Sequence, residues 1–152
     1  FKDILDTDFI ISLDKNLDKI DNEKKERIVF EILESDYITD YSLLEDFVIK
    51  YRNQGIKIAI DDFGTGYSNF AHILKIRPNY IKIDGSLIKN INTDKNSYEL
   101  VKSIIDFSKA LNIKVIAEFV HSREVYESIL NLGVDEFQGF YLGEPSLNIE
   151  WF

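Results

Sequence analysis

Apolar residues recur along this chain at two different spacings. Between Ile4 and Ile20 they return every three or four residues, which predicts an amphipathic helix. Shorter apolar runs, bounded by glycine, proline or charged residues, predict strands that are buried on both faces. Five such strands are expected, at Arg27–Glu34, Ile56–Ile60, Tyr80–Asp84 and Lys114–Glu118, and as a last short strand around Gln138 within Val134–Tyr141.

Helical spacing returns between these strands. A charged break is expected at Asn22–Glu26 and an irregular tail from Gly143 onward. Alternating strands and helices are typical of a parallel sheet with crossover helices. The sequence therefore predicts an α/β fold of about five parallel βα units. The helical segments are expected at Tyr41–Asn53, Ser68–Leu74, Asn96–Leu111 and Ser122–Leu132, with a helical turn at Ser86–Ile91.

The composition narrows the classes of function. With 152 residues, 45% of them hydrophobic, the chain is long enough for one globular domain with a buried core. A net charge of −9 argues against a nucleic-acid polymer as partner, and the lack of cysteine excludes disulfides and thiolate metal sites. No apolar run reaches about 18 residues and no signal peptide is visible, so we expect no membrane segment and a cytoplasmic location.

Polar residues stand at the carboxyl ends of the expected strands. In α/β folds these ends meet at one edge, where ligands bind. Any one of the acids could be a solvated strand end or a helix cap. Their joint placement favours a functional site, formed by Glu31, Asp61, Asp62, Lys82, Glu118 and Gln138.

The chemistry of this set points to hard divalent cations, which prefer oxygen ligands. Two such cations can activate a water and stabilise the leaving oxygen of a phosphodiester, and Lys82 would orient the water or a phosphate oxygen. Gly64-Thr65-Gly66 lacks the spacing and the lysine of a phosphate-binding loop, so it is expected to shape a turn. His72 is expected on a helix surface, whereas His121 could approach the site.

Five motifs, taken in order, resemble the EAL domain family, and together they span essentially the whole chain. The motif at Ile60–Ser68 is the most specific of them. The others include Phe30-Glu31-Ile32-Leu33-Glu34-Ser35, Ile81-Lys82-Ile83-Asp84-Gly85, Ala117-Glu118-Phe119-Val120 and Gln138-Gly139.

The resemblance implies a TIM-like barrel that hydrolyses cyclic di-GMP to the linear dinucleotide pGpG with two Mg²⁺ or Mn²⁺ ions. By motif position, Lys82 contacts the catalytic water and acts with Asp61 and Glu118, and Gln138 binds substrate. The loop that follows Asp62 resembles the one that couples dimerisation to metal binding in the family. The implied metal ligands are Glu31, Asp61, Asp62 and Glu118, and the implied control loop is Phe63, Gly64, Thr65, Gly66, Tyr67 and Ser68.

The chain also departs from the family pattern. The Glu-Ala-Leu strand and the Asn-x-Ser strand are absent, and His121 stands where the family often has a second glutamate. Residues 1–152 are therefore expected to be the C-terminal portion of a single EAL domain, a partial barrel, since a complete one needs about 250 residues. We expect the chain alone to be inactive, to form a homo-oligomer and to follow signalling domains upstream.

Three alternatives remain open from the sequence. A degenerate EAL domain would bind cyclic di-GMP, or a protein partner, without hydrolysing it. A flavodoxin-like receiver domain has a similar length and also uses paired acids and a lysine, but it carries the acid pair after its first strand. A purely structural module would leave the polar strand ends unexplained.

Overall fold

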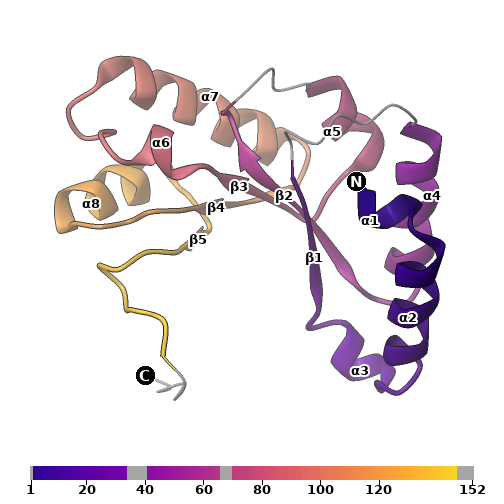
Figure 1. The fold of residues 1–152 in the computed structure, drawn as a ribbon. Helices are drawn as coiled ribbons and strands as arrows, with labels where there is room; N and C mark the ends of the chain where they lie inside the picture. Colours follow the sequence, from indigo (N-terminus) through magenta and orange to yellow (C-terminus); the bar gives the residue numbers. More distant parts are fainter. Residues whose placement is uncertain (1, 34–40, 66–69, 147–152) are drawn as a thin grey trace. The chain divides into compact units, whose positions relative to one another are not determined.

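The computed structural model describes residues 2–33, 41–65 and 70–146 (Figure 1). Strand β1 pairs in parallel with β2, and β4 pairs in parallel with β5. The α/β class with five strands in one sheet is therefore confirmed. The sheet order is β1-β2-β3-β4-β5, with bounds Val29–Leu33, Lys57–Phe63, Tyr80–Ile83, Lys114–Ala117 and Glu136–Phe137.

The chain divides into two compact units, residues 1–81 and residues 82–152, and the boundary falls inside β3. The first unit holds the paired strands β1 and β2. Their register sets Glu31 opposite Ala59 and Leu33 opposite Asp61. The helices of this unit are α1 (Lys2–Leu5), α2 (Thr7–Leu17), α3 (Asn22–Lys25), α4 (Tyr41–Arg52) and α5 (Phe70–Ile76).

The single helix expected from Ile4 to Ile20 is two helices. Asp6 interrupts it with an extended backbone, and its Oδ1 accepts hydrogen bonds from the backbone N–H groups of Asp8 and Phe9, at 2.9 and 3.1 Å. An aspartate that satisfies these first N–H groups is a favourable N-cap, so a new helix begins at Thr7. The charged break expected after Ile20 contains the short helix α3.

Helix α4 packs against α2 and the neighbouring strands through the side chains that the periodicity places on one face. Leu44, Val48 and Tyr51 are buried, and Tyr51 belongs to a cluster with Leu17 and Ile56. The Tyr51 ring meets the Phe30 and Phe47 rings edge-on, with centroids 5.2 and 4.6 Å away. Edge-to-face aromatic contacts of this kind add to the burial energy of the rings.

The second unit packs helices α6 (Gly85–Ile88), α7 (Lys95–Ala110) and α8 (Arg123–Leu132) with β4 and β5. The core of this unit consists mainly of buried aliphatic side chains. Helix α7 begins after Asp94, whose carboxylate accepts hydrogen bonds from the N–H groups of Asn96 and Ser97. The buried side chains include Ile88, Val101, Ile104, Ile105, Val115, Val125 and Ile129.

The last strand was expected to be short and to lie around Gln138, but it ends one residue earlier. Strand β5 ends at Phe137, and the chain then turns, because Gly139 accepts hydrogen bonds at its carbonyl from the N–H groups of Leu142 and Gly143. Gln138 consequently lies just beyond the strand. Among the residues that the structure describes, no helix is long and apolar enough to cross a membrane.

Candidate functional site

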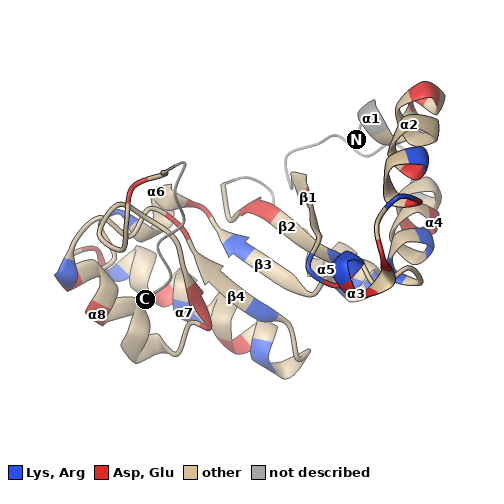
Figure 2. Ribbon diagram, turned by 90° about the horizontal axis from the view of Figure 1, so that it is seen from below, with Lys and Arg blue, Asp and Glu red and all other residues tan. Residues whose placement is uncertain are grey.

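Two carboxylates stand side by side at the end of β2. The strand continues through Asp61 and Asp62 to Phe63, so both acids belong to it rather than following it. Successive strand residues normally point to opposite faces, but Asp62 has φ +54°, which breaks that alternation. A carboxylate oxygen of Asp61 and one of Asp62 lie within 4.8 Å of each other, and Figure 2 shows acidic residues at this end of β2.

The local hydrogen bonds fix this pair. Asp61 Oδ1 accepts the backbone N–H of Asp62 at 3.0 Å, and the Thr65 hydroxyl donates to the Asp62 carbonyl at 3.1 Å. Gly64 has φ +100°, a conformation that glycine adopts easily, so the chain can turn there. Phe63 is buried and meets the Phe70 ring edge-on at 5.6 Å. The rest of the predicted control loop, Gly66, Tyr67 and Ser68, lies outside the described residues.

Glu31 lies in β1 and is exposed. Because it pairs with Ala59, and Ala59 and Asp61 are two residues apart on β2, Glu31 and Asp61 belong to the same face of the β1–β2 pair. His72 lies on α5 and is half-buried, and desolvation, with a smaller contribution from Lys75, lowers the pKa of its imidazole.

Lys82 and Glu118 form an ion pair in the second unit. Lys82 Nζ lies 2.9 Å from Glu118 Oε1, and the two side chains are only 8% and 18% exposed. A lysine is rarely buried unless it is paired, because removing an ammonium group from water is costly. The N–H of Glu118 donates to the carbonyl of Ile83 at 3.2 Å, which ties the end of β4 to β3. The two predicted strand-end residues are thus brought together.

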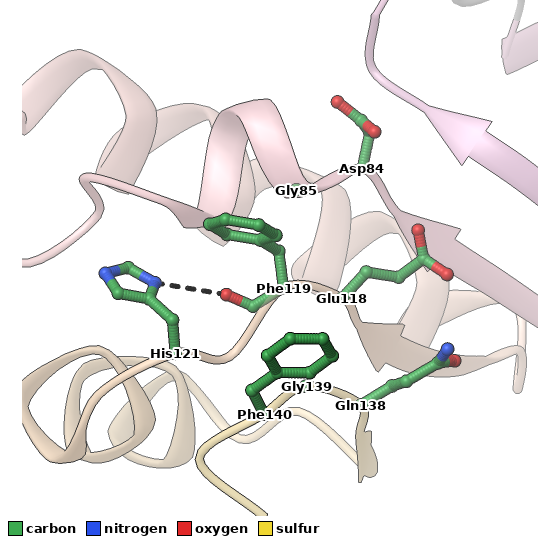
Figure 3. A pocket seen from close by; sticks show the side chains of 8 residues that line it. All are labelled: Asp84, Gly85, Glu118, Phe119, His121, Gln138, Gly139 and Phe140. Atoms are coloured by element: carbon green, nitrogen blue, oxygen red, sulfur yellow. Dashed lines mark hydrogen bonds between the residues drawn. The ribbon is translucent and has the colours of Figure 1, made fainter. Parts of the chain in front are cut away.

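A recess of about 510 Å³ lies beside Glu118 (Figure 3). Gln138 contributes to it, as does His121, which lines the same recess as Glu118. Sequence reasoning treated Asp84 and Gly85 only as the end of a strand and assigned no role to Phe119 or Phe140. The lining residues are Asp84, Gly85, Glu118, Phe119, His121, Gln138, Gly139 and Phe140.

The chain matches a known family and several named proteins. The model of the EAL domain matches residues 2–145. The cyclic di-GMP phosphodiesterase PdeF of Escherichia coli K12 is 36% identical over 119 residues, which are 78% of this chain and 16% of that protein. The chain therefore spans about a sixth of the length of this curated relative.

Two solved structures have the same fold. The PaMucR phosphodiesterase in complex with c-di-GMP has a TM-score of 0.83 at 27% identity, and the match covers 94% of this chain and 57% of that one. The manganese and cyclic di-GMP complex of Klebsiella pneumoniae BlrP1 has a TM-score of 0.77 at 29% identity, over 89% of this chain and 34% of that one. The TIM-like character of the fold is confirmed by these likenesses.

Proposed function

The chain belongs to the EAL domain family, and from that membership we propose that it is part of a phosphodiesterase domain that hydrolyses cyclic di-GMP to linear pGpG. Curated relatives carry the name cyclic di-GMP phosphodiesterase, which supports the substrate class. The observation that carries the proposal is the buried pair of Lys82 and Glu118, 2.9 Å apart at the carboxyl ends of β3 and β4. A receiver domain is excluded by the family match.

The residues fit divalent cations. Asp61 and Asp62 offer two carboxylate oxygens within 4.8 Å of each other, and oxygen donors of this kind suit Mg²⁺ or Mn²⁺. We propose Glu31, Asp61, Asp62 and Glu118 as the ligands. A bound pair of ions would supply Lewis-acid activation of water and neutralise charge on the phosphate. The manganese complex of the related BlrP1 domain supports a divalent metal.

The remaining residues hold and orient the substrate. Glu118 holds the Lys82 ammonium group in place by the ion pair, so that this group can hold the attacking water or a phosphate oxygen. Gln138, exposed in the recess beside Glu118, can donate and accept hydrogen bonds to the substrate. The segment from Phe63 to Ser68 directly follows Asp62, and we propose that it links dimerisation to metal binding.

A metal-binding experiment tests the ligand assignment. Titration of the chain with Mn²⁺ by isothermal calorimetry should give an affinity that falls about tenfold or more in D61N, since removing a ligand charge weakens a hard-cation site. The matched control is D46N, which neutralises an exposed aspartate on α4. Equal Mn²⁺ affinities for the parent and D61N would overturn the assignment.

A turnover experiment tests the enzyme against its alternative. We propose that the 152-residue chain alone hydrolyses little cyclic di-GMP, because the strands that carry further family ligands are absent from its sequence. Metal-dependent hydrolysis by this chain, abolished by D61N, would contradict that. The degenerate receptor remains the second candidate, and cyclic di-GMP binding that needs no divalent metal would favour it.

The name of one relative supports further domains in the whole protein. One curated relative, from Pseudomonas aeruginosa, is the bifunctional diguanylate cyclase and cyclic di-GMP phosphodiesterase MucR, and this chain spans 17% of it. We therefore propose that the domain is joined to further signalling domains and works as a homo-oligomer. Size-exclusion chromatography with light scattering measures the second part, and a strictly monomeric chain would contradict it.

A further inference from the structure

Phe119 has an unusual backbone conformation next to the buried ion pair. Its φ is +55°, in the left-handed region that a bulky residue seldom adopts. Such outliers persist only where the surrounding structure determines them, and they cluster at functional sites. The ring is half exposed, so burial alone does not explain the conformation.

The residues on both sides of Phe119 are fixed by backbone hydrogen bonds. The Glu118 N–H donates to the Ile83 carbonyl at 3.2 Å, and the Val120 N–H donates to the Gln138 carbonyl at 3.0 Å. The backbone before residue 119 is bonded to β3, and the backbone after it is bonded to the segment that follows β5. The chain therefore has to turn from one partner to the other at residue 119.

The Phe119 side chain fills the space over Gly85 (Figure 3). A Cβ atom placed on Gly85 would lie 2.6 Å from the Phe119 Cβ and 3.1 Å from its Cγ, so only glycine permits this contact. On the other side, His121 Nδ1 lies 3.2 Å from the Phe119 carbonyl oxygen, to which the Nδ1–H tautomer donates, and the two rings are 5.3 Å apart. The side chain and the carbonyl are thus both held.

We propose that Phe119 is a positioning residue: its side chain, held against Gly85, keeps the left-handed turn from which Glu118 reaches Lys82. If the ring moved, the turn could relax toward negative φ, and the Glu118 carboxylate would swing away from the Lys82 ammonium group. The role concerns the Lys82–Glu118 pair itself, so it can be tested without metal or substrate and apart from the proposed function.

The test compares F119G with the parent chain by NMR. Glycine populates positive and negative φ about equally, so F119G removes the ring and leaves residue 119 free to move out of the left-handed conformation. We expect the amide protons of Glu118 and Val120, and the ammonium protons of Lys82, to exchange with solvent about tenfold faster in F119G, because the local opening becomes easier. F119L, which keeps a branched side chain over Gly85, should restore slow exchange.

Two further variants make the result specific. L130A removes a half-exposed apolar side chain from α8 in the same unit and should leave the three exchange rates unchanged. E118Q removes the negative charge of the ion pair. It therefore gives the exchange rate of the Lys82 ammonium protons that is expected when the ion pair is absent. The proposal would be overturned if the F119G exchange rates equalled those of the parent. It would also be overturned if the two amides exchanged faster while the Lys82 ammonium rate stayed the same, or if the amides throughout α7 and α8 exchanged equally faster.

Discussion

Asp14 joins two helices of the first unit through both of its carboxylate oxygens. Oδ2 lies 2.6 Å from Lys50 Nζ, and Oδ1 accepts a hydrogen bond from the Tyr51 hydroxyl at 3.0 Å. The bond from Lys50 holds the pKa of Asp14 below its usual value of 3.8, despite some desolvation, and the same bond raises the pKa of Lys50. Burial, followed by the bond to Asp14, raises the pKa of Tyr51.

D14N should lower the free energy of unfolding at neutral pH by about 1 kcal/mol or less, since Asp14 is partly exposed and solvent screens the pair. The folded-state pKa is lowered, so the stabilisation is complete above pH 3.8 and is lost as the pH falls through the folded value. Urea unfolding between pH 7 and pH 2 measures the difference between parent and D14N, which should shrink in acid. A difference that stays constant with pH would contradict this origin, and D46N provides an exposed control.

The sequence predicted which residues come together at the site better than it predicted their backbone angles. The strand-end pattern singled out Lys82 and Glu118, and the structure pairs them. The positive φ of Phe119 left no comparable pattern, because a bulky L-residue reaches that region only when contacts from elsewhere in the chain impose it. For Phe119 those contacts involve Gly85, which is far away in sequence.

Helix α8 shows why some element boundaries were predictable. Ser122 Oγ accepts the Val125 N–H at 3.3 Å at the start, and Gly133, with φ +79°, ends the helix. Both signals are local, so the sequence predicted these bounds closely. The end of β5 depends instead on its pairing with β4 and on the turn at Gly139, so the short strand expected around Gln138 stops at Phe137.

G133A should destabilise the second unit by about 1 kcal/mol, because alanine is strained where glycine has positive φ. A Cβ at this position would also meet Lys109 Nζ at 2.5 Å, which would displace the hydrogen bond from Lys109 to the Leu132 carbonyl. Urea denaturation followed by circular dichroism measures the loss. G143A is the matched control, since a Cβ there meets nothing within 4 Å. An equal effect of both changes would contradict the C-cap explanation.

At the scale of the whole chain, alternation of strands and helices was sufficient to predict the order of the elements. Each βα unit carries its own periodicity and its own stop signals, and the crossover rule supplies parallel pairing. The exact length of each strand, such as β5, was not predictable in the same way. It depends on the pairing with neighbouring strands and on what packs beside them, which no local pattern records.

Strand β1 lies at the end of the sheet order and carries exposed apolar side chains. Val29 and Leu33 are 39% and 42% exposed, and they share their strand face with the exposed Glu31. Edge strands with exposed apolar side chains tend to pair with other chains, and a lysine on the edge opposes this.

We therefore expect the chain to associate as its concentration rises and V29K to weaken that association about tenfold, measured by sedimentation equilibrium. L130K, which places the same charge on an exposed leucine of α8, is the control and should associate like the parent. If V29K and L130K reduced association equally, the added charge and not the β1 edge would be responsible. If the parent stayed monomeric at high concentration, the edge would not be an association site.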